Sequence, residues 1–126
     1  MSPLKPRKNV LGGDLAPCSN QPLTGFFRTG CCDTSNDDRG SHTVCTEVTQ
    51  DFLEYLVSRG NDLVTPMPQY NFPGLKPGDR WCVCAGSWKE AYDAGKAAPV
   101  HLAATHEGAL EHVPFEALVE WALDKQ

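Results

Sequence analysis

Six cysteines are the residues of this chain best able to do chemistry. A thiolate can attack an electrophile, ligate a metal ion or pair with a second sulfur. None of the cysteines follows residue 84, and they are Cys18, Cys31, Cys32, Cys45, Cys82 and Cys84. The chain contains no Cys-x-x-Cys motif, so their spacing does not by itself identify a zinc or redox motif.

A reactive thiol is the first hypothesis, and it rests on the segment TGFFRTGCCD, residues 24–33. Arg28 is close in sequence to Cys31 and Cys32, and a neighbouring cation favours the nucleophilic thiolate. His42 follows in the next loop. In this interpretation Cys31 or Cys32 is the nucleophile, Arg28 stabilises its thiolate, and His42 is the general base.

A metal site is the second hypothesis. Zinc takes four tetrahedral ligands, usually cysteine sulfurs and histidine nitrogens. The sequences His42-x-x-Cys45 and Cys82-x-Cys84 supply such groups, and the cysteines of the second pair share one face of a predicted strand. The candidate ligands for zinc or another transition metal are Cys45, Cys82, Cys84 and His42. No other cofactor is indicated.

Simpler interpretations stay open for the same residues. Free cysteine is often a small buried hydrophobic residue, so the cysteines could be purely structural. His101 or His106 would join the chemistry, as ligand or base, only by facing Cys82 and Cys84 across a sheet. Residues 37–39, DDR, are expected to be a solvated turn.

Composition limits the classes of protein and partner. A chain of 126 residues and 13.8 kDa fits one domain, which we place at residues 9–126 after a disordered basic tail at residues 1–8. A net charge of −5 argues against nucleic acid as a partner. No apolar segment approaches the roughly twenty residues that span a bilayer, so no membrane association is expected.

The expected location is the cytoplasm. The basic residues of the N-terminal tail are followed by no apolar segment of the kind found in a signal peptide. Thiols in the cytoplasm stay reduced, so we expect no disulfide framework from the even number of cysteines.

The predicted elements alternate irregularly, which indicates an α+β domain with a small, mostly antiparallel sheet. Apolar spacing predicts a helix over residues 46–59, ended by Gly60, and alternation predicts a strand over residues 80–85. Ser87 and Glu90 have the spacing of a capping box that would start a second helix.

The remaining segments complete this prediction. Residues 10–41 are expected to form turns and short strands, and residues 61–79, with four prolines, a long loop packed across the domain. A hairpin is predicted from strands at residues 100–105 and 110–113, followed by a helix that starts near Pro114.

Several long segments together resemble one known family. They are NVLGGDLAPC, TGFFRTGCCDT, DDRGSHTVCTEVTQDFL, GNDLVTP, FPGLKPGDRWCVCA and VHLAATHEGALEHVPFEAL. The chain resembles the domain of unknown function 2237 family over nearly everything from Asn9 to Asp124. This resemblance implies a small soluble α+β domain of bacterial type, and it implies no reaction, cofactor or catalytic residue.

Two functional hypotheses therefore remain. The first is a protein with a clustered Cys/His constellation that forms a thiol- or metal-dependent site. The alternative is a binding module in which the cysteines are structural and the loop at residues 65–76 contacts a small molecule or a protein.

Overall fold

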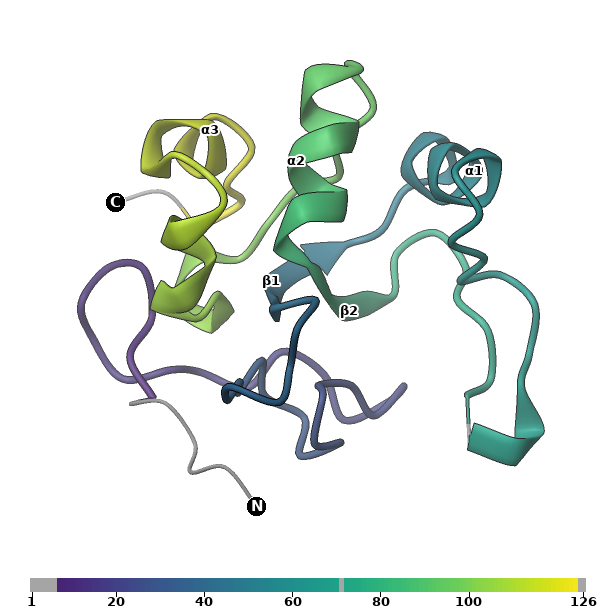
Figure 1. Cartoon of the computed structure of the whole chain (residues 1–126), viewed down its shortest axis with the longest axis horizontal. Coiled ribbons are helices and arrows are strands. Elements are labelled where there is room, and N and C mark those ends of the chain that lie inside the picture. Colours follow the sequence, from purple (N-terminus) through teal and green to yellow (C-terminus); the bar gives the residue numbers. More distant parts are fainter. Residues whose placement is uncertain (1–6, 71, 125–126) are drawn as a thin grey trace.

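The computed structural model describes residues 7–70 and 72–124. It contains a two-stranded sheet and three α-helices, which confirms the α+β class. In chain order the strands and α-helices are β1 (His42–Glu47), α1 (Gln50–Ser58), β2 (Arg80–Cys84), α2 (Ala85–Asp93) and α3 (Phe115–Glu120). Figure 1 shows the three helices on one side of the β1–β2 pair and the N-terminal segment on the other. None of the helices in the described residues has the length and apolar character needed to traverse a bilayer.

The antiparallel β1–β2 pair is the centre of the fold. Cys45 lies opposite Cys82, and Thr46 lies opposite Trp81. The predicted strand at residues 80–85 is confirmed, and its alternation separates Trp81, in the main core, from Cys82, in a smaller cluster. Strand β1 was not predicted from the sequence. Residues 43–46 are buried on both faces, so apolar and polar residues do not alternate as they do in a half-exposed strand.

Helix α1 begins later than predicted. Thr46 and Glu47 belong to β1, and the helix starts at Gln50. Thr49 is its N-cap, since the Thr49 hydroxyl accepts a hydrogen bond from the Phe52 backbone N–H at 3.2 Å. Sheet pairing therefore determined the conformation of two residues that the apolar spacing assigned to the helix.

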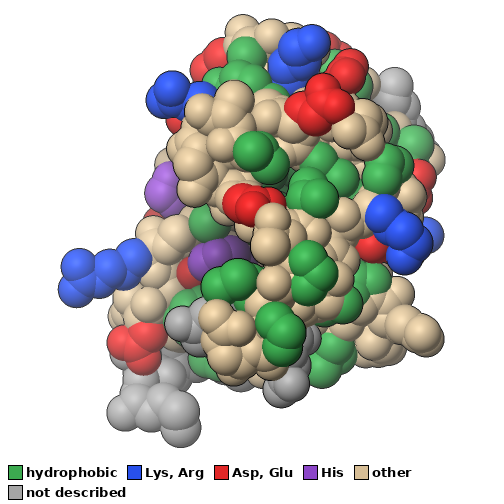
Figure 2. Space-filling model, turned by 90° about the vertical axis from the view of Figure 1, so that its right-hand side faces the viewer, with side chains coloured by type: hydrophobic (Ala, Val, Ile, Leu, Met, Phe, Trp, Pro, Cys, Tyr) green, Lys and Arg blue, Asp and Glu red, His purple; other side chains and the backbone are tan. Residues whose placement is uncertain are grey.

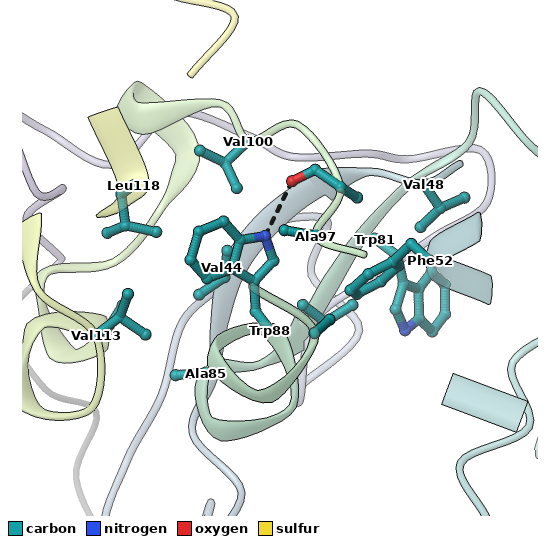
Figure 3. Close-up of a cluster of buried hydrophobic side chains, with 14 of the residues drawn as sticks. Val44, Val48, Phe52, Trp81, Ala85, Trp88, Ala97, Val100, Val113 and Leu118 are labelled. Carbon is teal, nitrogen blue, oxygen red and sulfur yellow. Dashed lines mark hydrogen bonds between the residues drawn. The ribbon is translucent and has the colours of Figure 1, made fainter. Parts of the chain in front are cut away.

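Helix α2 follows β2 with no intervening loop. The predicted capping box is wrong, because the helix starts at Ala85 and its N-cap is Cys84. Trp88, a residue of this helix, is fully buried. Its indole N–H donates to the Ala98 carbonyl at 2.9 Å (Figure 3). Val44, Val100 and other apolar side chains surround it.

The predicted hairpin near the C-terminus is wrong. Residues 102–104 and 107–111 form 3-10 turns, and Val100 makes only isolated bridges to Thr46 and Ala122. The Asp124 carboxylate accepts from the backbone N–H groups of Leu102 and Ala103, at 2.6 and 2.9 Å, and so stabilises the first turn. The final helix after Pro114 is confirmed as α3.

The proline-rich loop is partly anchored to the domain. Phe72 and Leu75 are buried, and the Phe72 ring contacts Trp81 with centroids 5.1 Å apart. A bridge between Met67 and Phe72 closes the end of the loop, which projects beyond α1 in Figure 1.

The N-terminal segment is turn-rich, as predicted. Of the expected tail, residues 1–6 lie outside the described residues. Arg7 is paired with Asp33 at 2.8 Å, and Lys8 is paired with Asp14 at the same distance.

Candidate active site

Four of the six cysteines form two disulfides, so the expectation of reduced thiols is wrong. Cys18 is bonded to Cys45, and Cys32 is bonded to Cys82. Cys45 and Cys82 are neighbours across the antiparallel β1–β2 pair, on the face opposite the main core. Hydrogen bonds to the Gly30 carbonyl hold the two N-terminal loops together beside this face. The pairing of the sulfurs therefore follows from the way the loops cover the sheet.

Cys31 and Cys84 are the free thiols of the described residues, and Cys84 has a histidine partner. Its Sγ lies 3.3 Å from Nε2 of His42. Cys84 is half-buried, ends β2 and is the N-cap of α2. A thiol at this position lies near the positive end of the helix dipole, which favours negative charge.

Asp38 orients the His42 ring from the other side. Its Oδ1 lies 2.6 Å from Nδ1 of His42, and its side chain is 0% exposed. The second carboxylate oxygen accepts hydrogen bonds from the Thr34 hydroxyl at 3.0 Å and the His42 backbone N–H at 2.8 Å. The carboxylate is thus fixed, and it turns Nε2 of His42 toward the thiol.

The backbone around these residues is specialised to bring them together. A bulge in β1 falls between His42 and Val44, and Ser41 has a φ of 51°. A side chain at Gly40 would place its Cβ 2.9 Å from the Cys84 sulfur and 3.2 Å from Cε1 of His42. A side chain at position 40 would therefore force the Cys84 sulfur or the His42 ring to move from the observed contact.

The pKa of His42 is raised to about 9. The hydrogen bond with Cys84 is the largest cause, and Asp38 adds to it through a hydrogen bond and its charge. Burial acts in the opposite direction and is outweighed. At neutral pH the ring is consequently an imidazolium, with one N–H toward the carboxylate and the other toward the sulfur.

A cavity of about 230 Å³ opens beside the exposed side of His42. Its other lining residues come mainly from the loop after α1 and from β2: Arg28, Asp62, Leu63, Met67, Phe72 and Trp81. Figure 2 looks onto the side of the molecule with α1 and this loop, where a histidine lies among hydrophobic side chains. The site can thus hold a small, partly apolar molecule against the imidazole.

Arg28 belongs to this cavity. Its guanidinium lies 5.1 Å from the centroid of the Trp81 ring and donates to the Gly25 carbonyl at 2.6 Å. The backbone at Arg28 has a φ of 54°, in the left-handed region. The cation next to Cys31 is Arg7, whose Nη2 lies 3.2 Å from the sulfur.

The structure divides the candidate residues between two places. Cys32, Cys45 and Cys82 lie in the disulfide cluster, whereas His42 contacts Cys84. His101 lies 3.5 Å from the Glu47 carboxylate, and Nδ1 of His106 accepts from the Gly108 N–H at 2.9 Å.

Asp38 is the member of the site that the sequence interpretation missed. It was expected in a solvated turn, yet only 5% of the residue is exposed. The signal in the sequence is its position four residues before His42 in DDRGSH. That spacing identifies an orienting carboxylate only when the turn around Gly40 is known.

A family model confirms the resemblance found in the sequence. The model described as "Uncharacterized protein conserved in bacteria (DUF2237)" matches residues 8–122. The chain belongs to this family. The match includes every residue of the site: Asp38, Gly40, His42 and Cys84. No significant match was found among curated proteins.

Proposed function

We propose that the protein is a thiol-dependent enzyme in which Cys84 is the nucleophile, His42 exchanges protons with the substrate, and Asp38 orients His42. The single observation that carries this proposal is the continuous contact from the buried carboxylate through the imidazole to the sulfur. A nucleophile beside a base that a third group orients is the arrangement that activates cysteine and serine in acyl transfer.

The proposed reaction is acyl transfer to water. Sγ of Cys84, as a thiolate beside the His42 imidazolium, attacks the carbonyl carbon of an ester, thioester or amide, and a C–S bond forms as the bond to the leaving group breaks. The His42 imidazolium gives its proton to the leaving group. His42, now neutral, takes a proton from water, which attacks the thioester. The acid is released, and the Cys84 thiolate and the His42 imidazolium are restored.

The cavity supports a substrate that carries a negative charge next to an apolar group. Arg28 supplies a positive charge, and Trp81, Phe72 and Met67 supply apolar and aromatic surface. The cavity carboxylate, Asp62, is already hydrogen bonded to the Thr65 hydroxyl at 2.6 Å. The Ala85 N–H at the start of α2 donates to the Ser41 carbonyl at 2.9 Å, but the N–H groups that follow it in the first turn can donate to a developing oxyanion near Cys84.

Small activated esters and thioesters, with and without a carboxylate on the acyl chain, test the proposal. We expect Cys84→Ser to lower kcat/KM by more than about 100-fold, and His42→Ala to have a similar effect. Cys31→Ser is the matched control because it removes the other free thiol and should leave kcat/KM unchanged. Hydrolysis that survives in Cys84→Ser would contradict the proposal.

A binding module with structural cysteines is the second candidate. It is favoured by the two disulfides and by exposed apolar side chains on α1 and the following loop, Val57, Val64 and Met67. In this case a ligand would protect Met67 and Phe72 from hydrogen exchange or labelling, and Cys84→Ser would bind it unchanged.

Location and partners remain proposals in both cases. The negative net charge supports the absence of a nucleic-acid partner. The cytoplasm keeps thiols reduced, so in a cytoplasmic protein the two disulfides would face cellular reductants. Cell fractionation followed by thiol labelling tests this point.

A further inference from the structure

The four disulfide-bonded cysteines form a compact group that we call the sulfur cluster: Cys18, Cys32, Cys45 and Cys82. The sulfurs of Cys18, Cys32 and Cys82 all lie within 4.8 Å of one another, although Cys18 is not bonded to either of the others. Cys45, the fourth member, is bonded to Cys18. The two disulfides are therefore close neighbours, with three of their four sulfurs within 4.8 Å of one another.

Backbone hydrogen bonds connect the segments that carry the four cysteines, in addition to the disulfides. Cys45 and Cys82 are opposite each other in the β1–β2 ladder. The backbone N–H of Cys18 donates to the Gly30 carbonyl at 2.7 Å, two residues before Cys32. Thr24 anchors the same region to β2, since its hydroxyl accepts from the Cys82 N–H at 2.8 Å. Reduction of the disulfides would leave four thiols on segments that these hydrogen bonds still connect.

We propose that the reduced sulfur cluster binds one Zn²⁺ as a tetrathiolate, and that the disulfide form is its oxidised, metal-free state. Tetrahedral zinc with bonds of about 2.3 Å places its sulfurs about 3.8 Å apart. The sulfurs of Cys18, Cys32 and Cys82 already lie within 4.8 Å of one another, and Cys45 is bonded to Cys18. Once the two S–S bonds are broken, side-chain rotations separate the formerly bonded sulfurs to the spacing that zinc requires.

A dithiol reductant converts the disulfide form of the sulfur cluster to the form that binds zinc. Each disulfide takes two electrons and two protons from a dithiol reductant, which becomes a disulfide itself. The four thiols then lose up to four protons to the solvent as Zn²⁺ binds, and the metal keeps its oxidation state. A disulfide oxidant, which becomes a dithiol, or a peroxide, which becomes water, would reverse the process by forming the two disulfides and releasing the metal.

The surroundings favour zinc and exclude the other two cysteines. Ala16 and Ala104 are the nonpolar neighbours of the cluster, and all four cysteines are buried. An all-sulfur site without carboxylates selects zinc or copper(I) over magnesium or calcium. Cys31 and Cys84 instead contact Arg7 and His42, so this proposal is independent of the proposed active site.

Thiol protection in the whole protein tests the proposal. The protein is reduced under native conditions with a phosphine, freed of the reductant without air, and titrated with Zn²⁺ or with Co²⁺ as a spectroscopic probe. We expect one metal ion per chain and a cobalt spectrum of tetrahedral thiolate ligation. Alkylation followed by peptide mass analysis should label Cys31 and Cys84 and leave the four cluster cysteines unlabelled.

Variants separate this site from the other thiols. Cys82→Ser should weaken zinc binding by more than about 100-fold, whereas Cys31→Ser and Cys84→Ser should bind as the unaltered protein does. The proposal is overturned if the native disulfides resist reduction, if the reduced protein binds no zinc, or if zinc leaves the cluster cysteines as reactive as Cys31. Should Cys82→Ser fail to fold, the labelling pattern of the unaltered protein decides the question.

Discussion

Cys82 and Cys84 are two residues apart on one strand, yet their environments give them different chemistry. Cys82 lies in the buried sulfur cluster, next to other cysteines and two alanines. Cys84, at the end of the strand, meets the His42 imidazole and the beginning of α2. The first environment surrounds two S–S bonds with nonpolar groups, whereas the second places a free thiol next to a positive ring. The neighbours of a cysteine therefore determine its role more than its spacing does.

The largest expected effect concerns the stability that each group of sulfurs contributes. Closing chain segments of 50 and 27 residues should contribute about 4 and about 3.5 kcal/mol, respectively, to the free energy of unfolding. Replacing both Cys32 and Cys82 by serine should therefore be severely destabilising, and replacing Cys18 and Cys45 slightly less so. Urea unfolding without reductant measures both.

Cys84→Ser is the matched control for these double variants. It removes a half-buried thiol and closes no loop, so its free energy of unfolding should fall by less than about 1.5 kcal/mol. Equal losses in all three variants would remove the distinction between structural and reactive sulfurs.

The second effect concerns reactivity. At about pH 7, iodoacetamide should modify Cys84 at least about 10-fold faster than Cys31, because Cys84 is half-buried beside the charged His42 ring whereas Cys31 is buried. His42→Ala should remove most of this advantage, and Asp38→Asn part of it. Mass analysis of timed alkylation gives the two rates. Similar rates for both thiols in the unaltered protein would show that the imidazole does not activate Cys84.

Much of the fold was readable from local patterns. The β2 strand, the final helix and the turn-rich N-terminal segment follow from alternation, apolar spacing, and glycine and proline content. The errors occur where long-range contacts decide the conformation. Thr46 pairs with Trp81 in place of continuing a helix, and Asp124 stabilises a 3-10 turn at Leu102 where alternation predicted a strand.

The site was only partly predictable for the same reason. His42 stood out by residue type, and Cys84 was expected near it as a metal ligand. Their contact depends on the β1–β2 register and on the bulge after His42, neither of which local spacing encodes. The disulfides likewise join residues 27 and 50 positions apart. Only the packing of the N-terminal loops on the sheet shows which sulfurs meet.

The third effect concerns pH. The folded-state pKa of His42, about 9, lies above its ordinary value of 6.5, so the ring's contribution to stability is fully present below about pH 6.5. That contribution is lost as the pH rises through about 9. Because the side chain is 36% exposed, solvent screening limits the loss to roughly 1–2 kcal/mol. Urea unfolding from about pH 6 to 10 measures it, and His42→Gln should flatten this part of the profile. If the unaltered protein and His42→Gln lose stability equally between about pH 6 and 10, groups other than His42 cause the loss.

The smallest effect isolates the geometry of the Cys84 environment. Gly40→Ala would place a methyl group 2.9 Å from the Cys84 sulfur and 3.2 Å from Cε1 of His42, so ring and thiol must separate. We expect the pKa of His42 to fall from about 9 toward 6.5, with the loss of only part of the ring's contribution to stability. An NMR titration of the imidazole signals measures the shift.

Gly86→Ala is the control for that substitution, because a Cβ at Gly86, in the first turn of α2, meets no atom within 4 Å. It should leave the pKa of His42 unchanged and stabilise the helix slightly. If Gly40→Ala also leaves the titration unchanged, the close approach at Gly40 does not maintain the contact between thiol and ring. If only Gly40→Ala shifts it, the distinct chemistry of Cys84 and Cys82 depends on one missing side chain in the turn before β1.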